Sequence, residues 1–112
     1  MIEKFVLDYL SENLSDPVYM VRPKDRPERY YIVQKTGSGE RNHIYTTTIA
    51  VQSYAPTLYE AAVMNETMKT VMRDITENHE IPDCVLNSDY EFTNTADKSF
   101  RYQAVFDLVN YI

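Results

Sequence analysis

The chain has 112 residues, of which 44% are hydrophobic and 25% charged, the composition of an ordinary globular protein. This length predicts one domain, residues 1–112, that is large enough to bury a hydrophobic core without disulfide bonds. A formal net charge of −6 disfavours a protein whose main task is to bind nucleic acid, because such proteins usually carry a basic surface. A single cysteine excludes an internal disulfide, and no apolar run approaches the roughly 18 residues that span a bilayer.

The first part of the chain predicts a helix, a short strand and a loop. Residues 2–14 place their apolar side chains on one helical face. Asp16-Pro17 ends that helix, because the residue before a proline is driven out of the helical region. Residues 18–21 are expected to form a short strand. Residues 22–29, which contain two prolines, are expected to form an extended loop.

The middle of the chain predicts two strands and a long helix. The strands cover residues 30–35 and 44–54, and the segment Gly37–Asn42 is expected to form the turn between them. Thr57 opens a capping box, in which its hydroxyl accepts from the backbone N–H of Glu60 and the glutamate reaches back. Apolar residues at helical spacing continue this helix for about five turns, to near residue 78.

Two further strands, over residues 84–92 and 100–111, are joined by a polar turn at residues 93–99. The element order is therefore α-β-β-β-α-β-β. This order predicts an α+β fold, a two-layer sandwich in which two helices pack on a mixed, mostly antiparallel sheet.

Gly37-Ser38-Gly39 has the composition of a phosphate-binding glycine loop. Such loops follow a strand and open a helix, whose N-terminal amides bind the anion. Here the glycines lie between two predicted strands and match neither standard spacing, so a loop that joins the strands is favoured. A small ligand- or anion-binding regulatory module that uses residues 37–42 is the alternative function.

Catalytic and metal-binding patterns are weak. Cys84 and His79 are close in sequence, but a nucleophilic pair requires a hydrogen bond that spacing alone does not establish. A cysteine inside a strand is more often a small buried side chain. His43, His79 and Cys84 do not have the spacing of a metal site. We therefore expect a protein that is not an enzyme and has no catalytic residue, cofactor or metal ion.

Several features favour contact with other proteins. The basic segment 22–29 is either a solvated loop or an arm that docks on an acidic neighbour, and its prolines lower the entropy cost of ordering it. Tyr59 and Val63 form an apolar pair on the polar face of the second helix, and the last strand is apolar on both faces. The candidate interface residues are Arg22, Lys24, Arg26, Arg29, Gly37, Ser38, Gly39, Arg41, Asn42, Tyr59, Val63, Val105, Val109 and Tyr111.

Six segments share features with one known group of proteins. They are the strand end Gln34–Gly39, the strand end Gln52–Ala55, the helix start Glu60–Ala62, the final strand at residues 101–109, the opening helix and the proline-bearing segment Pro23–Glu28. In these segments, which span most of the chain, the sequence resembles the tail-terminator (tail-completion, head–tail joining) proteins of long-tailed bacteriophages. Ser38 stands where that family often has glycine.

The resemblance implies a non-enzymatic virion component that forms a ring, usually a hexamer, at the head-proximal end of the tail tube. The implied partners are other copies of the chain, the major tail tube protein and the head–tail connector or stopper protein. DNA would only pass through the lumen, without specific binding, and no membrane is involved. The implied location is the virion tail, and the bacterial host cytoplasm during assembly. Ring contacts are heterologous, so each subunit needs two different surfaces.

Overall fold

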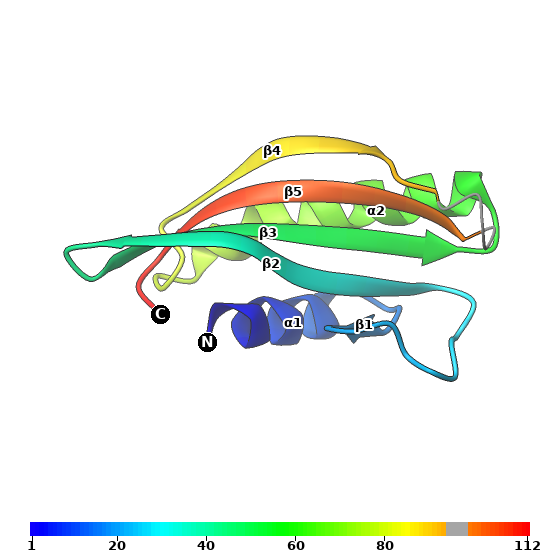
Figure 1. Cartoon of the computed structure of the whole chain (residues 1–112), viewed down its shortest axis with the longest axis horizontal. Helices are drawn as coiled ribbons and strands as arrows, with labels where there is room; N and C mark the ends of the chain where they lie inside the picture. Colours follow the sequence, from blue (N-terminus) through cyan, green and yellow to red (C-terminus); the bar gives the residue numbers. More distant parts are fainter. Residues whose placement is uncertain (94–98) are drawn as a thin grey trace.

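The computed structural model describes residues 1–93 and 99–112, so most of the turn predicted at residues 93–99 lies outside the described residues. Figure 1 shows the arrangement of the elements, whose order is the one predicted from the sequence. The elements are the helices α1 (Ile2–Asn13) and α2 (Leu58–Arg73), the short 3₁₀ helix η1 (Asp74–Glu77), and the strands β1 (Val18–Tyr19), β2 (Tyr30–Arg41), β3 (Ile44–Ala55), β4 (Asp83–Glu91) and β5 (Phe100–Asn110).

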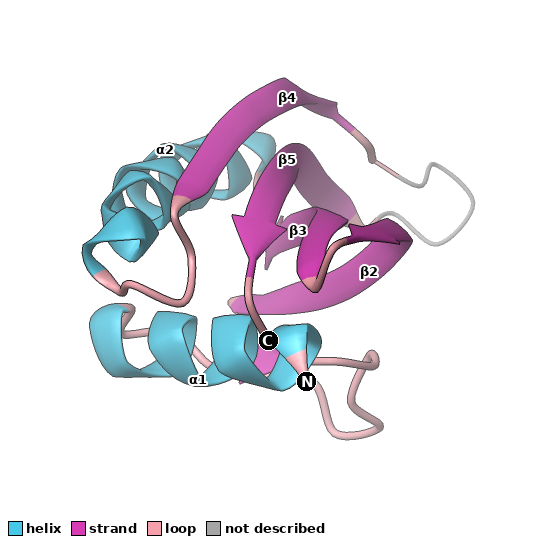
Figure 2. Cartoon of the chain, turned by 90° about the vertical axis from the view of Figure 1, so that its left-hand side faces the viewer, coloured by secondary structure: helices cyan, strands magenta, loops and turns pink. Residues whose placement is uncertain are grey.

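The five strands form one sheet in the order β1-β2-β3-β5-β4. β1 is parallel to β2, and every other neighbouring pair is antiparallel. Figure 2 shows both helices on the same side of the sheet. We call the other side, which no helix of the described chain covers, the open face. The predicted two-layer α+β fold with a mixed, mostly antiparallel sheet is confirmed.

α2 begins where the capping box predicts. The Thr57 hydroxyl accepts a hydrogen bond from the backbone N–H of Glu60 at 3.2 Å and donates one to the Glu60 carboxylate at 3.0 Å. The α-helix ends at Arg73 rather than near Asn78, because its last turn tightens into η1, as is common at helix C-termini. No helix of the described residues is long and apolar enough to cross a membrane.

The main core lies between the two helices and the sheet. α1 contributes Ile2, Val6 and Leu10, which share one face of the helix. They meet an apolar stripe of α2 and alternate residues of the central strands. The buried members of these other elements include Ala61, Met64, Met68, Met72, Ile49, Val51, Ala104, Phe106 and Leu108. Full burial of each large apolar side chain contributes roughly 1.5–3 kcal/mol.

A smaller cluster is buried on the open face. It consists of Tyr30, Ile32 and Tyr54, with Tyr19 packed against them. The rings of Tyr30 and Tyr54 stack with their centroids 4.7 Å apart. At this end of the sheet both faces of β2 are therefore buried, one under the helices and one under this cluster.

The turn between β2 and β3 differs from the prediction. β2 continues in pairing with β3 as far as Arg41, so the turn predicted at residues 37–42 is wrong. Asn42 and His43 alone reverse the chain, with φ angles of 54° and 65° in the left-handed region. Two consecutive residues with positive φ form a tight hairpin turn, and asparagine tolerates this conformation well. Neither glycine has a positive φ, so both are strand residues.

We expect the turn, and not the glycines, to limit the stability of the hairpin. His43→Gly should stabilise the fold by about 0.5–1 kcal/mol, because glycine adopts a positive φ without the steric cost of a side chain. In the control variant Gly37→Ala, the added Cβ meets nothing within 4 Å. Its free energy of unfolding should change by less than about 0.5 kcal/mol. Urea unfolding measures both, and a large loss in Gly37→Ala would restore a conformational role for that glycine.

Candidate functional site

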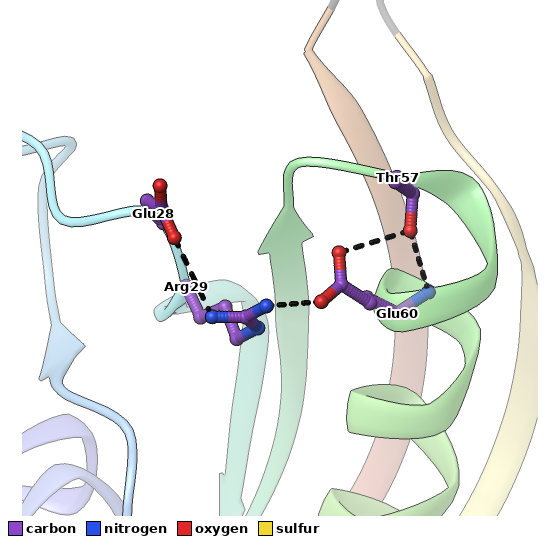
Figure 3. Close-up of polar contacts among 4 residues, drawn as sticks. All are labelled: Glu28, Arg29, Thr57 and Glu60. Atoms are coloured by element: carbon purple, nitrogen blue, oxygen red, sulfur yellow. Dashed lines mark hydrogen bonds and ion pairs between the residues drawn. The ribbon is translucent and has the colours of Figure 1, made fainter.

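Arg29 of the basic loop is engaged within the chain. Its guanidinium forms an ion pair with Glu60, and its Nη1 lies 3.6 Å from Glu28 Oε2 (Figure 3). The hydrogen bond from Arg29 lowers the pKa of Glu60, which also belongs to the capping box with Thr57. Arg29 therefore joins the end of the loop to the first turn of α2.

Arg22 anchors the start of the same loop. Its Nε donates to the Tyr30 hydroxyl at 3.0 Å, its guanidinium lies 5.3 Å from the centre of the Tyr54 ring, and its Nη2 donates to Ser99. Arg101 lies 5.6 Å from the same ring and donates to the Tyr54 hydroxyl at 2.7 Å. We call Arg22, Tyr30, Tyr54 and Arg101 the arginine–tyrosine cluster. No pattern in the sequence predicted this cluster, because its members are distant in the chain.

Lys24 and Arg26 are the two cations of the loop that remain exposed. Arg26 makes one weak hydrogen bond, from its Nε to the Pro23 carbonyl at 3.3 Å. The basic segment thus divides into two residues that hold the loop in place, Arg22 and Arg29, and two that are available to a partner. Of the four cations predicted for a docking arm, only Lys24 and Arg26 are thus exposed.

The glycines line a hollow of about 430 Å³ on the open face. The opposite wall carries Asp83 and Asp107, and Asp107 accepts hydrogen bonds from the Thr48 hydroxyl at 3.0 Å and from the Asn87 amide at 2.9 Å. Two carboxylates repel an anion, and no helix N-terminus of the described chain lines the hollow. The geometry therefore offers little to a phosphate. The hollow is lined from all four long strands, so the open face is concave here.

The candidate interface residues of α2, of β5 and of the segment after β5 lie in three places. Tyr59 is 77% exposed and Val63 47% exposed, and both line a groove of about 530 Å³ between the start of α2 and the end of α1. Val105 and Val109 lie on the open face of β5 and are partly buried. Tyr111 follows β5 and is 54% exposed. The structure does not bring these positions together into one patch.

Cys84 and His79 are not brought into contact by any hydrogen bond. His79 is an exposed residue whose Nε2 lies 3.4 Å from Glu80 Oε1. The Cys84 thiol packs against the main core, and burial raises its pKa to about 11. Such a thiol is almost entirely protonated at neutral pH and is a poor nucleophile. No group of three metal-ligating side chains occurs among residues 1–93 and 99–112.

Two strand edges lack a neighbour in the described chain, and no pattern in the sequence predicted them. β4 is the last strand of the sheet, and beyond Ile32 β2 has only β3 beside it. β4 is tied to α2 by Lys69, 8% exposed, whose ammonium pairs with Asp89. Unpaired edges present backbone N–H and C=O groups that pair readily with another chain.

Arg22 should contribute to stability, whereas Lys24 should not. Arg22→Ala removes the hydrogen bonds to Tyr30 and Ser99 and a cation–π contact with Tyr54, so the free energy of unfolding should fall by about 1–2 kcal/mol. Lys24→Ala, the matched control in the same loop, should shift it by less than about 0.5 kcal/mol. Thermal and urea unfolding report both values. Equal effects of the two substitutions would contradict the anchoring role of Arg22.

The raised pKa of Cys84 has a measurable consequence. At pH 8 iodoacetamide should modify the folded protein about a hundredfold more slowly than the urea-unfolded chain, because the reaction needs the thiolate and the pKa is about two units higher. The rate should rise as the pH approaches the raised pKa. Equal rates at pH 8 in the two states would indicate an accessible, reactive thiol and reopen a catalytic role.

Comparison of the chain with protein-family models gave no match, and comparison with curated proteins gave none either. The residues and the geometry described above are therefore the basis for inferring a function. They show an α+β domain with an exposed pair of cations at one end and two strand edges without a neighbour in the described chain.

Proposed function

We propose that this protein is a tail-completion protein of a long-tailed bacteriophage. In this proposal it forms a ring, of six subunits, between the tail tube and the head connector, in the virion tail after assembly in the bacterial host cytoplasm. The observation that carries the proposal is the sequence resemblance to that family. The matched segments form neighbouring parts of one unit: Gln52–Ala55 ends β3, Glu60–Ala62 lies in the first turns of α2, and residues 101–109 fill most of β5.

The surface supports an assembly role. A closed ring of identical subunits needs two different, complementary patches on each subunit. The chain has such a pair in the outer edge of β4 and in the part of β2 beyond Ile32. These lie at opposite edges of the sheet. Lys24 and Arg26 are exposed on the 22–29 loop, at the end of the molecule opposite the β2–β3 hairpin (Figure 1). These cations suit an acidic surface of the tail tube protein or of the connector.

The carboxylates of the hollow are compatible with the passage of DNA without specific binding. Asp83 and Asp107 line this hollow, and the chain as a whole carries a net charge of −6. The cations of the open face lie away from these two carboxylates, in the arginine–tyrosine cluster and at the end of β2. In a ring whose lumen is lined by the hollow, the carboxylates would repel the phosphate backbone there.

Light scattering after size exclusion tests the proposed function. The protein should form hexamers as its concentration rises over about a hundredfold range, or form rings when purified tail tubes are added. Electron microscopy of tube ends should then show a cap. A protein that stays monomeric in both conditions, and gains thermal stability from phosphate or a nucleotide, would overturn the proposal in favour of a ligand-binding module.

Charge reversal of the exposed cations tests the docking arm. Lys24→Glu combined with Arg26→Glu should leave the melting temperature nearly unchanged and weaken binding to tail tubes or connectors by roughly tenfold or more. Lys4→Glu, on α1, is the control for added negative charge and should bind normally. If the double variant binds as well as the wild type, Lys24 and Arg26 are not the docking residues.

A further inference from the structure

The two unpaired edges have opposite directions, which allows them to pair with each other in neighbouring copies. β2 is antiparallel to β3, β3 to β5, and β5 to β4, so β2 and β4 are antiparallel to each other. A rotation about an axis along the strands preserves these directions. It therefore places the β4 edge of one copy beside an antiparallel β2 edge of the next. Pairing β4 with β4 would need a two-fold axis and would end after two copies.

The sheet pairings define which residues stand at the same level on the two edges. The residue pairings from β4 through β5 and β3 to β2 place Asp83 level with Gly39, Cys84 with Ser38, and Val85 with Gly37. A bulge interrupts each edge strand at nearly the same height, between Lys35 and Gly37 in β2 and between Leu86 and Ser88 in β4. The bulges limit the matching segments to residues 37–41 and 83–86.

We propose that residues 83–86 of β4 pair with residues 37–41 of β2 in the next copy, which extends the sheet from subunit to subunit. The proposal rests on the self-association in the proposed function and names its surface. Backbone hydrogen bonds of the two free edges would supply most of the attraction. β1 covers β2 only at Tyr31 and Ile32, so residues 37–41 are open to a neighbour.

Charge complementarity selects this partner over a second β4. The segment Asp83–Glu91 holds three carboxylates, Asp83, Asp89 and Glu91, and no cation, so two β4 strands would repel each other. In β2, Arg41 lies two residues from Gly39, on the open face that Asp83 also occupies. Arg41 is exposed and has no ion-pair partner within the described chain. Across the proposed junction, Arg41 and Asp83 form a diagonal pair, which long side chains span.

The exposed side chains of β4 fit the same partner. Val85 is 53% exposed and Leu86 40% exposed, which is unusual for the apolar side chains of an edge strand. Gly37 lies level with Val85 on the open face and has no side chain. The valine would therefore cover backbone at the junction without a clash.

A mixing experiment tests the pairing. Arg41→Asp and Asp83→Arg should each weaken self-association by roughly tenfold, because each places like charges across every junction. An equimolar mixture of the two variants should recover association, because alternating copies restore an opposite-charge pair at every junction. If Arg41 and Asp83 interacted within one copy and not between copies, mixing the two variants would not restore association. Mass photometry of the separate and mixed variants measures the effect, with the Lys4→Glu variant as a control that should assemble normally.

Disulfide cross-linking tests the register. Within one chain, Ser38 and Cys84 are separated by three strand spacings, about 14 Å along the sheet, which exceeds the reach of a disulfide. In Ser38→Cys, oxidation at pH 9 should therefore link each copy to the next through Cys84 and give a ladder of covalent oligomers on non-reducing gels. Wild-type protein and Ser38→Cys combined with Cys84→Ser should give no species beyond a dimer.

The outcomes separate the two proposals. Rings that form normally without a ladder, and without loss in Arg41→Asp or Asp83→Arg, would overturn the edge pairing and leave the proposed function standing. Open chains of cross-linked copies that never cap a tail tube would support the edge pairing and count against the tail-completion function. A protein that never self-associates would overturn both.

Discussion

The register of β3 between β2 and β5 is the constraint on which the rest of the structure depends. β3 is paired on both sides along almost its whole length. Because side chains alternate between the two faces, this register directs Ile49 and Val51 toward the helices and Gln52 and Tyr54 toward the open face. A slip of one residue would drive Gln52 into the apolar core and expose Val51. This one alignment determines the core, the cluster on the open face, and which residues of β2 and β4 lie at the same height on the two edges.

The arginine–tyrosine cluster is the second organising contact, because it joins segments that are distant in the chain. Arg22 comes from the loop before β2, and Arg101 comes from the start of β5. Both guanidinium groups lie against the Tyr54 ring, and Tyr54 in turn donates a hydrogen bond to Gln52 at 2.9 Å. On the open face, contacts between aromatic rings and guanidinium groups thus hold distant segments together, as aliphatic packing does between the sheet and the helices.

Local signals in the sequence predicted the elements well. The Thr57–Glu60 box and the helical spacing of the methionines depend only on near neighbours, so α2 and its buried face could be predicted. Glycine content was misleading at the hairpin, because pairing with β3 holds the glycines extended and hairpin closure places the positive φ angles at Asn42 and His43. Here the long-range pairing overrides the local preference of the residues.

Long-range partners could not be predicted from the charge pattern. The sequence identifies Arg29 as a cation, but not that its carboxylate partner, Glu60, lies across a hairpin on another element. The free edges could not be predicted either, because they depend on the strand order. β5, the last strand of the chain, lies between β3 and β4, and β4 is therefore an edge strand. Strand order depends on which hydrophobic faces meet in three dimensions, and no stretch of the sequence records it.

The hairpin end and the loop end of the molecule differ in chemistry. The β2–β3 hairpin lies at one end of the molecule and the loop before β2 at the other (Figure 1). The hairpin end carries a tight turn and two strand edges, and the loop contains prolines and the exposed cations Lys24 and Arg26. Rotational symmetry about the strand direction would keep all hairpin ends on one rim of a ring and all loops on the other. Such an assembly is polar along its axis. It would bind two unlike structures, one on each rim, in a fixed orientation, and would therefore act as an adaptor between them.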